Sequence, residues 1–116
     1  MIILSERREN MKKYIYDITL NTELGEKNGT LVRYTEKGYG TEHGIINILG
    51  ETNPFYAFAD PNGKYSLSVT LKTLMGERQF EGEGYVYPDK LEILLRSMRT
   101  NCLMCGTIKE VISDDE

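Results

Sequence analysis

The chain of 116 residues has only two cysteines, a single histidine and no apolar run that approaches the length of a membrane span. Two cysteines cannot staple a disulfide-rich scaffold, and a helix needs about 20 apolar residues to cross a bilayer. A structural zinc site needs about four ligands, more than two cysteines and one histidine supply. The composition therefore argues against secreted disulfide scaffolds and helical membrane proteins, and favours the reducing cytoplasm.

Positive charge is also scarce, with 14 Lys and Arg residues against 18 Asp and Glu residues and a net charge of −4. Surfaces that bind nucleic acids or acidic membranes carry an excess of positive charge. We therefore expect neither nucleic acid nor membrane among the partners. The length suits one domain that buries about two thirds of the surface of its unfolded chain.

The two ends of the chain differ from the rest, because the alternating pattern described below begins only after Met11. The codons of Glu6–Asn10 would form a purine-rich ribosome-binding sequence ahead of the Met11 codon, so we interpret residues 1–10 as a translated leader. The alternative is a short helical arm that has Ser5 as its N-cap and continues to Lys13. We predict a disordered acidic tail over residues 113–116 and a single domain over residues 11–112.

Three glycines at nearly equal spacing indicate a repeat: Gly25, Gly50 and Gly76 each stand between an apolar residue and a glutamate. Each lies between two alternating runs, where a glycine with positive φ is typical of a hairpin turn. A second set of turn signals lies roughly midway between these glycines, at 36–40, 60–64 and 87–90. The repeating unit is therefore a pair of strands, one out and one back.

Between the turns, apolar and polar residues alternate as they do in half-buried strands. Eight segments show this pattern: 14–20, 30–35, 44–49, 54–59, 65–73, 80–87, 90–95 and 102–108. The register of 30–35 is open, because either Leu31 with Arg33 or Val32 with Tyr34 faces inward. Short connections between successive strands produce an antiparallel meander.

An eight-stranded sheet with one apolar face has to cover that face. Closure on itself removes both edges, and about eight strands leave an interior that side chains fill or that holds one small ligand. We therefore predict an all-β fold, an eight-stranded antiparallel up-and-down barrel. A two-sheet β-sandwich is the alternative.

The sequence "GTL…GIINILGETNPF…DPNGKYSLSVTLKTLMGERQFEGEG" resembles a group of small bacterial proteins with lipocalin-like (calycin-like) barrels. Its most characteristic part is "LKTLMGE", followed by an aromatic residue and alternating glycines. The likeness covers about residues 11–112 and departs from the pattern at "LVRYT" in the second strand. It implies a closed barrel and carries over no catalytic or binding residue.

The two cysteines have the C-x-x-C spacing of redox and metal sites, which need a helix N-terminus or a tight turn. Cys102 and Cys105 instead fall in the strand 102–108, which aligns with 80–86. Residues three apart in a strand point to opposite faces. We therefore expect Cys102 to face inward and Cys105 outward, and we predict neither a metal site nor a cofactor.

The interior gives the one positive indication of function. Small residues occupy inward positions of three strands: Ala57, Ala59, Gly82, Gly84 and Gly106. Such space suits an apolar ligand, but glycines also let strands coil while Phe55, Phe80 and Met104 fill the volume. The predicted ligand-binding residues are Tyr16, Arg33, Ala57, Phe80, Gly82, Cys102 and Met104. Tyr16 or Arg33 would hold a carboxylate or hydroxyl group.

We thus predict a non-enzymatic cytoplasmic barrel that binds a small apolar or amphipathic molecule. His43 is expected on the outer face, without the neighbours that a general base needs. The alternative is a protein-interaction or structural module that acts through its outer sheet face or as a homodimer. Outward aromatic residues motivate this alternative: Tyr56, Phe58, Tyr85 and Tyr87.

Overall fold

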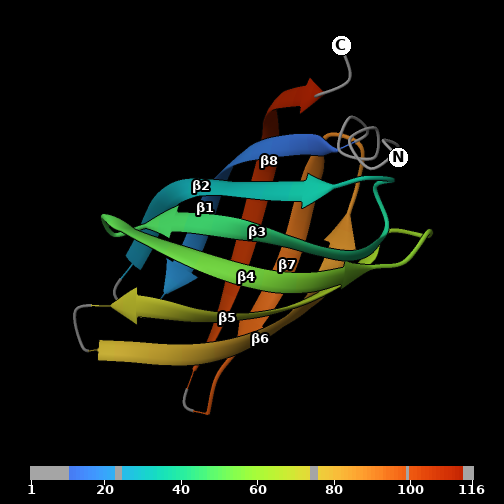
Figure 1. The fold of residues 1–116 in the computed structure, drawn as a ribbon. Coiled ribbons are helices and arrows are strands. Elements are labelled where there is room, and N and C mark those ends of the chain that lie inside the picture. Colours follow the sequence, from blue (N-terminus) through green and yellow to red (C-terminus); the bar gives the residue numbers. More distant parts are fainter. Residues whose placement is uncertain (1–10, 23–24, 74–75, 99, 114–116) are drawn as a thin grey trace, which may run out of the picture.

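The structure is a computed structural model that describes residues 11–22, 25–73, 76–98 and 100–113. Over these residues the chain forms eight strands: β1 (Lys12–Thr22), β2 (Gly25–Thr35), β3 (Gly40–Ile48), β4 (Glu51–Ala59), β5 (Lys64–Thr73), β6 (Gly76–Val86), β7 (Lys90–Arg96) and β8 (Asn101–Ser113). Successive strands pair antiparallel and β8 pairs with β1, which closes the barrel (Figure 1). The predicted up-and-down barrel is confirmed, and the two-sheet sandwich is wrong. Within the described residues, no helix is long and apolar enough to span a membrane.

The glycines that recur along the sequence lie at the hairpins at one end of the strands: Gly25 and Gly76 begin β2 and β6, and Gly50 lies in the turn between β3 and β4. Gly25, Gly50 and Gly76 have φ angles of 108°, 76° and 107°. These are left-handed conformations, which glycine adopts without the steric cost that a Cβ atom brings. The predicted hairpin repeat is therefore confirmed.

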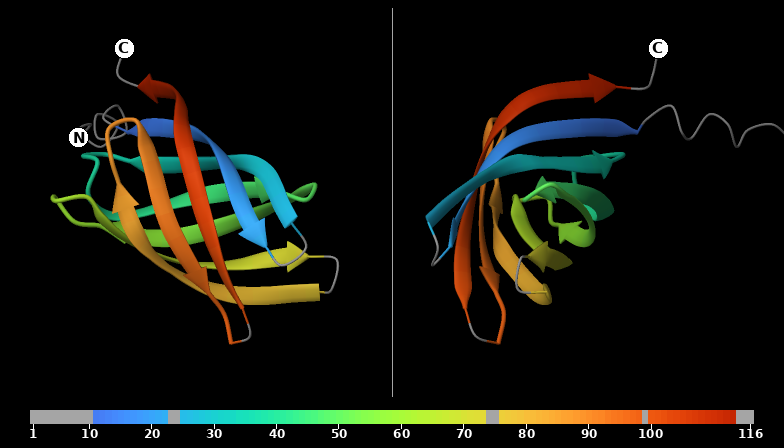
Figure 2. Two further views of the ribbon diagram at one scale, coloured as in Figure 1. Left: turned by 180° about the vertical axis from the view of Figure 1, so that it is seen from behind. Right: turned by 90° about the vertical axis from the view of Figure 1, so that its left-hand side faces the viewer.

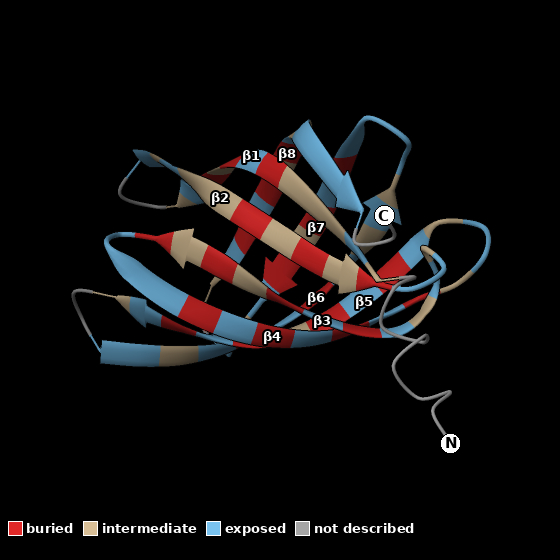
Figure 3. Cartoon of the chain, turned by 45° about the horizontal axis from the view of Figure 1, so that its top comes forward, coloured by how far each residue is buried: buried red, intermediate tan, exposed pale blue. Residues whose placement is uncertain are grey.

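The alternation of apolar and polar residues places one face of every strand inside the barrel (Figure 3). In β5, for example, Leu67, Val69 and Leu71 are each buried. The open register in β2 is resolved, since Leu31 and Arg33 are buried in the interior. A charged residue thus occupies an inward position, which is why the apolar pattern alone left this strand ambiguous.

The barrel closes through β1 and β8, which pair from Lys12 and Ser113 onward with a register shift between Ile15 and Tyr16. The β7–β8 ladder ends at Thr107, so the paired strands β1 and β8 continue beyond β7 (Figure 2). Lys12 and Lys13 belong to β1, so the alternative helical arm is wrong at these two residues.

The predictions for the two ends of the chain concern mostly residues that lie outside the described part of the structure. Ser113 belongs to β8 rather than to a tail. Residues 1–10, for which we predict a leader or helical arm, and residues 114–116 of the predicted acidic tail lie outside the described residues.

A buried asparagine stabilises the wall where β4 and β5 separate. The β4–β5 ladder extends only from Phe55 to Ala59 on the β4 side. Beyond it, the Asn53 Nδ2 donates to the Ile46 carbonyl (3.1 Å), and its Oδ1 accepts from the Lys72 backbone N–H (3.0 Å). Asn53 therefore connects β3 with β5 and satisfies backbone groups that a side chain without an amide would leave unpaired.

Candidate functional site

A charged pair is buried in the otherwise mainly apolar interior, near the connection of β2 and β3. Arg33 on β2 and Glu42 on β3 both face inward, and their side chains are 3% and 0% exposed. The Arg33 Nε donates to Glu42 Oε1 (2.6 Å), and its Nη2 donates to Oε2 (3.1 Å). Two parallel bonds of this kind form the strongest arginine–carboxylate geometry.

Two tyrosines complete a polar cluster, which we define as Tyr16, Arg33, Glu42 and Tyr65. The Tyr65 hydroxyl on β5 donates to Glu42 Oε1 (2.7 Å), and the Arg33 Nη1 donates to the Tyr16 hydroxyl on β1 (3.1 Å). The guanidinium carbon also lies 5.2 Å from the ring centroids of both Tyr14 and Tyr65. Cation–π contacts at this distance are attractive. Tyrosine side chains from two further strands, β1 and β5, thus hold the charged pair in place.

Burial and charge shift the acidity of the cluster. Burial raises the pKa of Tyr65, and the neighbouring Glu42 raises it further. Burial also raises the pKa of Tyr16, an effect that Arg33 partly opposes. Burial by itself lowers the pKa of Arg33, but the hydrogen bonds and charge of Glu42 outweigh it and raise that pKa above its ordinary value. At neutral pH the cluster therefore holds an arginine cation and two uncharged tyrosine hydroxyls.

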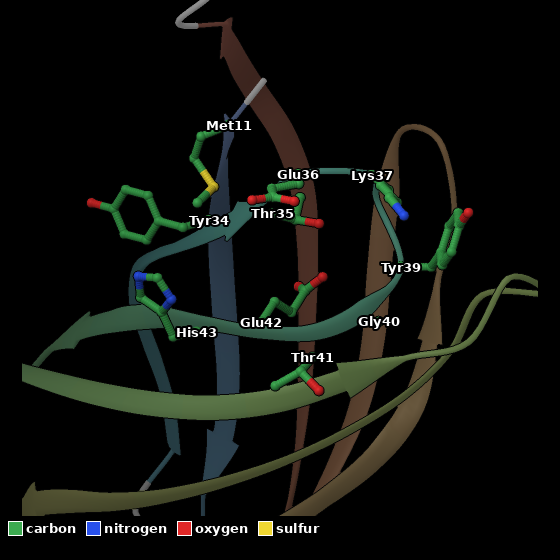
Figure 4. A pocket seen from close by; sticks show the side chains of 10 residues that line it. All are labelled: Met11, Tyr34, Thr35, Glu36, Lys37, Tyr39, Gly40, Thr41, Glu42 and His43. Atoms are coloured by element: carbon green, nitrogen blue, oxygen red, sulfur yellow. The ribbon is translucent and has the colours of Figure 1, made fainter. Parts of the chain in front are cut away.

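The cluster lies beside an opening in the barrel wall. The β2–β3 ladder ends at Tyr34 and His43, whereas β2 continues to Thr35 and β3 begins at Gly40, so the two strands separate before the connecting loop. A pocket of about 360 Å³ lies here, lined by Met11 and residues of the segment 34–43 (Figure 4). The rings of Tyr34 and His43 stack on one side (5.1 Å between centroids), and Glu42 lies toward the middle.

The connecting loop, residues 36–39, is bonded to the cluster. The Arg33 Nη2 donates to the Gly38 carbonyl (3.3 Å), and the Gly38 N–H donates to the Thr35 Oγ1 (2.9 Å). Gly38 and Gly40 have φ angles of 88° and 95°. Residues with a Cβ rarely adopt these angles, so the two glycines determine the path of the loop over the pocket.

The seven residues predicted to bind a ligand are all buried in the barrel: Tyr16, Arg33, Ala57, Phe80, Gly82, Cys102 and Met104. The structure brings Tyr16 and Arg33 together. The other five lie on β4, β6 and β8 and are not members of the polar cluster. The interior prediction is therefore right about burial, while only two of the seven residues meet at a polar site.

Neighbouring side chains fill the space that two of the inward glycines would leave. A Cβ atom added to Gly82 would lie 2.8 Å from Leu95 Cδ2, and one added to Gly106 would lie 2.9 Å from Ile18 Cγ2. The expectation of space at these two positions is wrong, because the surrounding leucine and isoleucine side chains pack over the glycines. The alternative interpretation, in which the glycines admit close packing, describes these two positions.

The C-x-x-C sequence lies in β8 as predicted. Cys102 is buried in the interior and Cys105 is half-buried on the opposite face. Within the described residues, no group of three or more His, Cys, Asp and Glu side chains is placed to hold a metal ion. His43 is exposed on the outer face, which confirms its predicted position.

Sequence analysis missed two members of the cluster, Glu42 and Tyr65. The alternating pattern indicates both: Glu42 is an even number of residues from the inward Ile46 in β3, and Tyr65 is an even number from the inward Leu67 in β5. Glutamates are ordinarily exposed, so the charge of Glu42 argues against the burial that its position in the alternating pattern indicates. Only the position of Arg33 identifies Glu42 as a buried partner.

Comparison with known proteins supports the fold class alone. No family model matches this chain, and no curated protein matches it. Among solved structures, a redesigned β-barrel is similar, with a TM-score of 0.64 and 12% sequence identity over 83% of this chain and 90% of that one. The protein thus belongs to the class of closed eight-stranded antiparallel barrels, here with a buried charged pair beside a wall opening.

Proposed function

We propose that this protein is a non-enzymatic barrel that binds a small amphipathic molecule, with the ligand's polar end at the Arg33–Glu42 pair. The observation that carries this proposal is that Glu42 of the buried pair lines the pocket between β2 and β3. A role as a carrier also agrees with the resemblance to lipocalin-like barrels. We place the protein in the cytoplasm, because two cysteines on opposite faces of one strand suit a reducing compartment.

A buried ion pair needs a physical reason. Removing two charges from water is costly, and well-packed apolar residues of the same volume are often as stable or more so. Eight strands closed into a barrel supply an apolar core without any charge. The pair is therefore better explained by recognition than by stability, since buried polar groups discriminate strongly between ligands.

The pocket has the volume of a small-molecule site. Ligand pockets hold about 300–1,000 Å³. Here the volume is about 360 Å³, and most lining side chains are polar or charged, with Met11, Tyr34 and Tyr39 as the large apolar or aromatic ones. A ligand that extends deeper, toward the predicted interior residues, has to displace the side chains packed beside Gly82.

Native mass spectrometry of freshly purified protein tests the proposal. We expect a bound small molecule in the wild type and its loss in the double variant Arg33→Met/Glu42→Leu, which removes both charges together. Ser68→Ala is the matched control, because Ser68 lies on the outer face of β5 and its hydroxyl donates to Glu81, away from the polar cluster. The proposal fails if the wild type retains no molecule and added amphiphiles shift no amide resonance of residues 34–43.

A second candidate function is binding of a protein partner, or of a second copy of this chain, through the outer face of β4. Tyr56 and Phe58 are 73% and 52% exposed there, and the residues opposite them on β5 are Ser68 and Ser66. Aromatic residues are enriched in protein interfaces. Sedimentation of the wild type and of Tyr56→Ser/Phe58→Ser tests this candidate. A strict monomer that captures no partner would leave it without support.

A further inference from the structure

We infer that the ligand's polar end is an uncharged hydrogen-bond acceptor, such as an amide, ester or ketone carbonyl, which takes the place of the Gly38 carbonyl on Arg33 Nη2. This inference rests on the proposed function and specifies its ligand class. It differs from the expectation drawn from the sequence, in which Arg33 holds a carboxylate.

The charge balance of the cluster favours a neutral ligand. Glu42 already neutralises Arg33 through two hydrogen bonds, and both side chains are nearly or fully buried. A ligand carboxylate would place a second negative charge beside Glu42, and a ligand amine would place a second positive charge beside Arg33. Either charge would be desolvated without a partner of its own, which is costly in a protein interior.

One bond of the guanidinium differs from the others. Within the described residues, the Arg33 side chain makes four hydrogen bonds, and three of them go to the buried side chains of Glu42 and Tyr16. The fourth, from Nη2 to the Gly38 carbonyl, is the longest at 3.3 Å and ends on a partly buried loop group. It is therefore the bond that a ligand exchanges with the least disturbance of the cluster.

The acceptor in that bond is itself chemically informative. Gly38 presents a neutral amide carbonyl to an arginine whose charge is already balanced. A ligand carbonyl that replaces it forms the same type of bond and leaves the charge balance unchanged. The loop thus presents to Arg33 a neutral carbonyl of the same type as the one we infer for the ligand.

The loop is able to release this carbonyl without leaving the barrel. The Gly38 N–H, which donates to Thr35 Oγ1, belongs to the peptide before Gly38, whereas the carbonyl belongs to the peptide after it. Rotation of the Gly38–Tyr39 peptide therefore breaks the bond to Arg33 and leaves the bond to Thr35 intact. Glycine tolerates such a rotation, and a Cβ added at Gly38 or Gly40 would have no atom within 4 Å.

Three ligands of equal chain length test the inference: octanamide, octanoate and octylamine. We measure dissociation constants at pH 7 from the amide resonances of residues 34–43 of the wild type. The expected result is that octanamide binds at least about tenfold more tightly than either charged molecule, a factor that corresponds to about 1.4 kcal/mol. Octanoate binding as tightly as octanamide, or more tightly, would overturn the inference while leaving the proposed function intact.

Failure of all three molecules to bind overturns the inference too, and native mass spectrometry of the purified wild type then decides the proposed function separately. The variant Glu42→Gln provides a second measurement. It leaves the Arg33 charge unbalanced, so octanoate should raise its melting temperature more than octanamide does, reversing the wild-type order. If octanamide remains the more stabilising ligand in this variant, charge balance does not determine the preference.

Discussion

Arg33 and Glu42 are diagonal neighbours across the β2–β3 hairpin rather than a directly opposed pair. The residue opposite Arg33 is Gly44, whose missing side chain leaves its space to the ring of Phe55. Arg33 therefore reaches past Gly44 to the glutamate two residues earlier on β3, where Nε and Oε1 are 2.6 Å apart. Diagonal contacts of this type lie within reach of long side chains.

The burial of this pair predicts strong coupling between its two side chains. We expect Arg33→Met and Glu42→Leu each to lower the free energy of unfolding by about 3–5 kcal/mol, because each leaves an unpaired buried charge. The double variant should lose less than either single variant, about 1–3 kcal/mol, from the hydroxyls of Tyr16 and Tyr65 that lose their partners. Urea denaturation measures all four proteins, and additive losses would contradict the prediction.

The raised pKa values of Tyr16 and Tyr65 predict a loss of stability in alkali. The folded protein keeps both protons above about pH 10, where the unfolded chain releases them. Stability is therefore unaffected by these groups below about pH 10 and falls above it, by at most about 1.4 kcal/mol per pH unit for each tyrosine.

Urea midpoints between pH 9 and pH 11.5 test this dependence, with Tyr65→Phe as the comparison. This variant should cost about 1.5–3 kcal/mol at pH 7, because it removes a hydrogen bond to Glu42. Its stability should then decline less steeply with pH than that of the wild type. Equal slopes in the two proteins would show that Tyr65 ionises alike in the folded and unfolded chains.

The opposite orientations of the two cysteines predict two rates of thiol modification. Cys105 is half-buried on the outer face, and Cys102 is buried in the interior. An aromatic disulfide reagent at pH 8 should modify one thiol of the native protein rapidly and the second only after unfolding. Cys105→Ser should abolish the rapid phase, and Cys102→Ala should retain it. Equal rates for both thiols would mean that the register of β8 is wrong.

Two glycines on β6 predict different costs for the same substitution. A Cβ at Gly82 would approach Leu95 Cδ2 at 2.8 Å, the movable end of a side chain, whereas one at Gly84 would overlap the backbone carbonyl of Glu92. We expect Gly82→Ala to cost about 1 kcal/mol and Gly84→Ala at least about 2 kcal/mol more, because a paired strand cannot move as a side chain does. Thermal unfolding of both variants measures this order.

The sequence predicted the fold well, because the turn glycines and the alternating pattern act locally and agree with each other. Gly25, Gly50 and Gly76 identify the hairpins without any knowledge of distant contacts. The register of β2 was not predictable in this way. Arg33 is buried only because Glu42 and Tyr16 meet it from two other strands, and these contacts exist only in the folded chain.

The candidate site was predicted in part for the same reason. Parity placed Tyr16 inside, and Tyr65 would have followed from the same argument applied to β5. The opening between β2 and β3 had no signal in the sequence, since it depends on where the ladder ends at Tyr34 and His43. The packing over Gly82 likewise depends on side chains of β5 and β7 that no local pattern brings together.

The closure of the barrel by β1 and β8 has a consequence for biosynthesis. Lys12 pairs with Ser113, so the edge of β1 that faces β8 stays uncovered until β8 has been synthesised. All four residues of the polar cluster, in contrast, lie on β1, β2, β3 and β5 and have been synthesised once β5 is made. Until β8 follows, β1 lacks the strand that covers its second edge, and an uncovered strand edge is a surface on which chains aggregate.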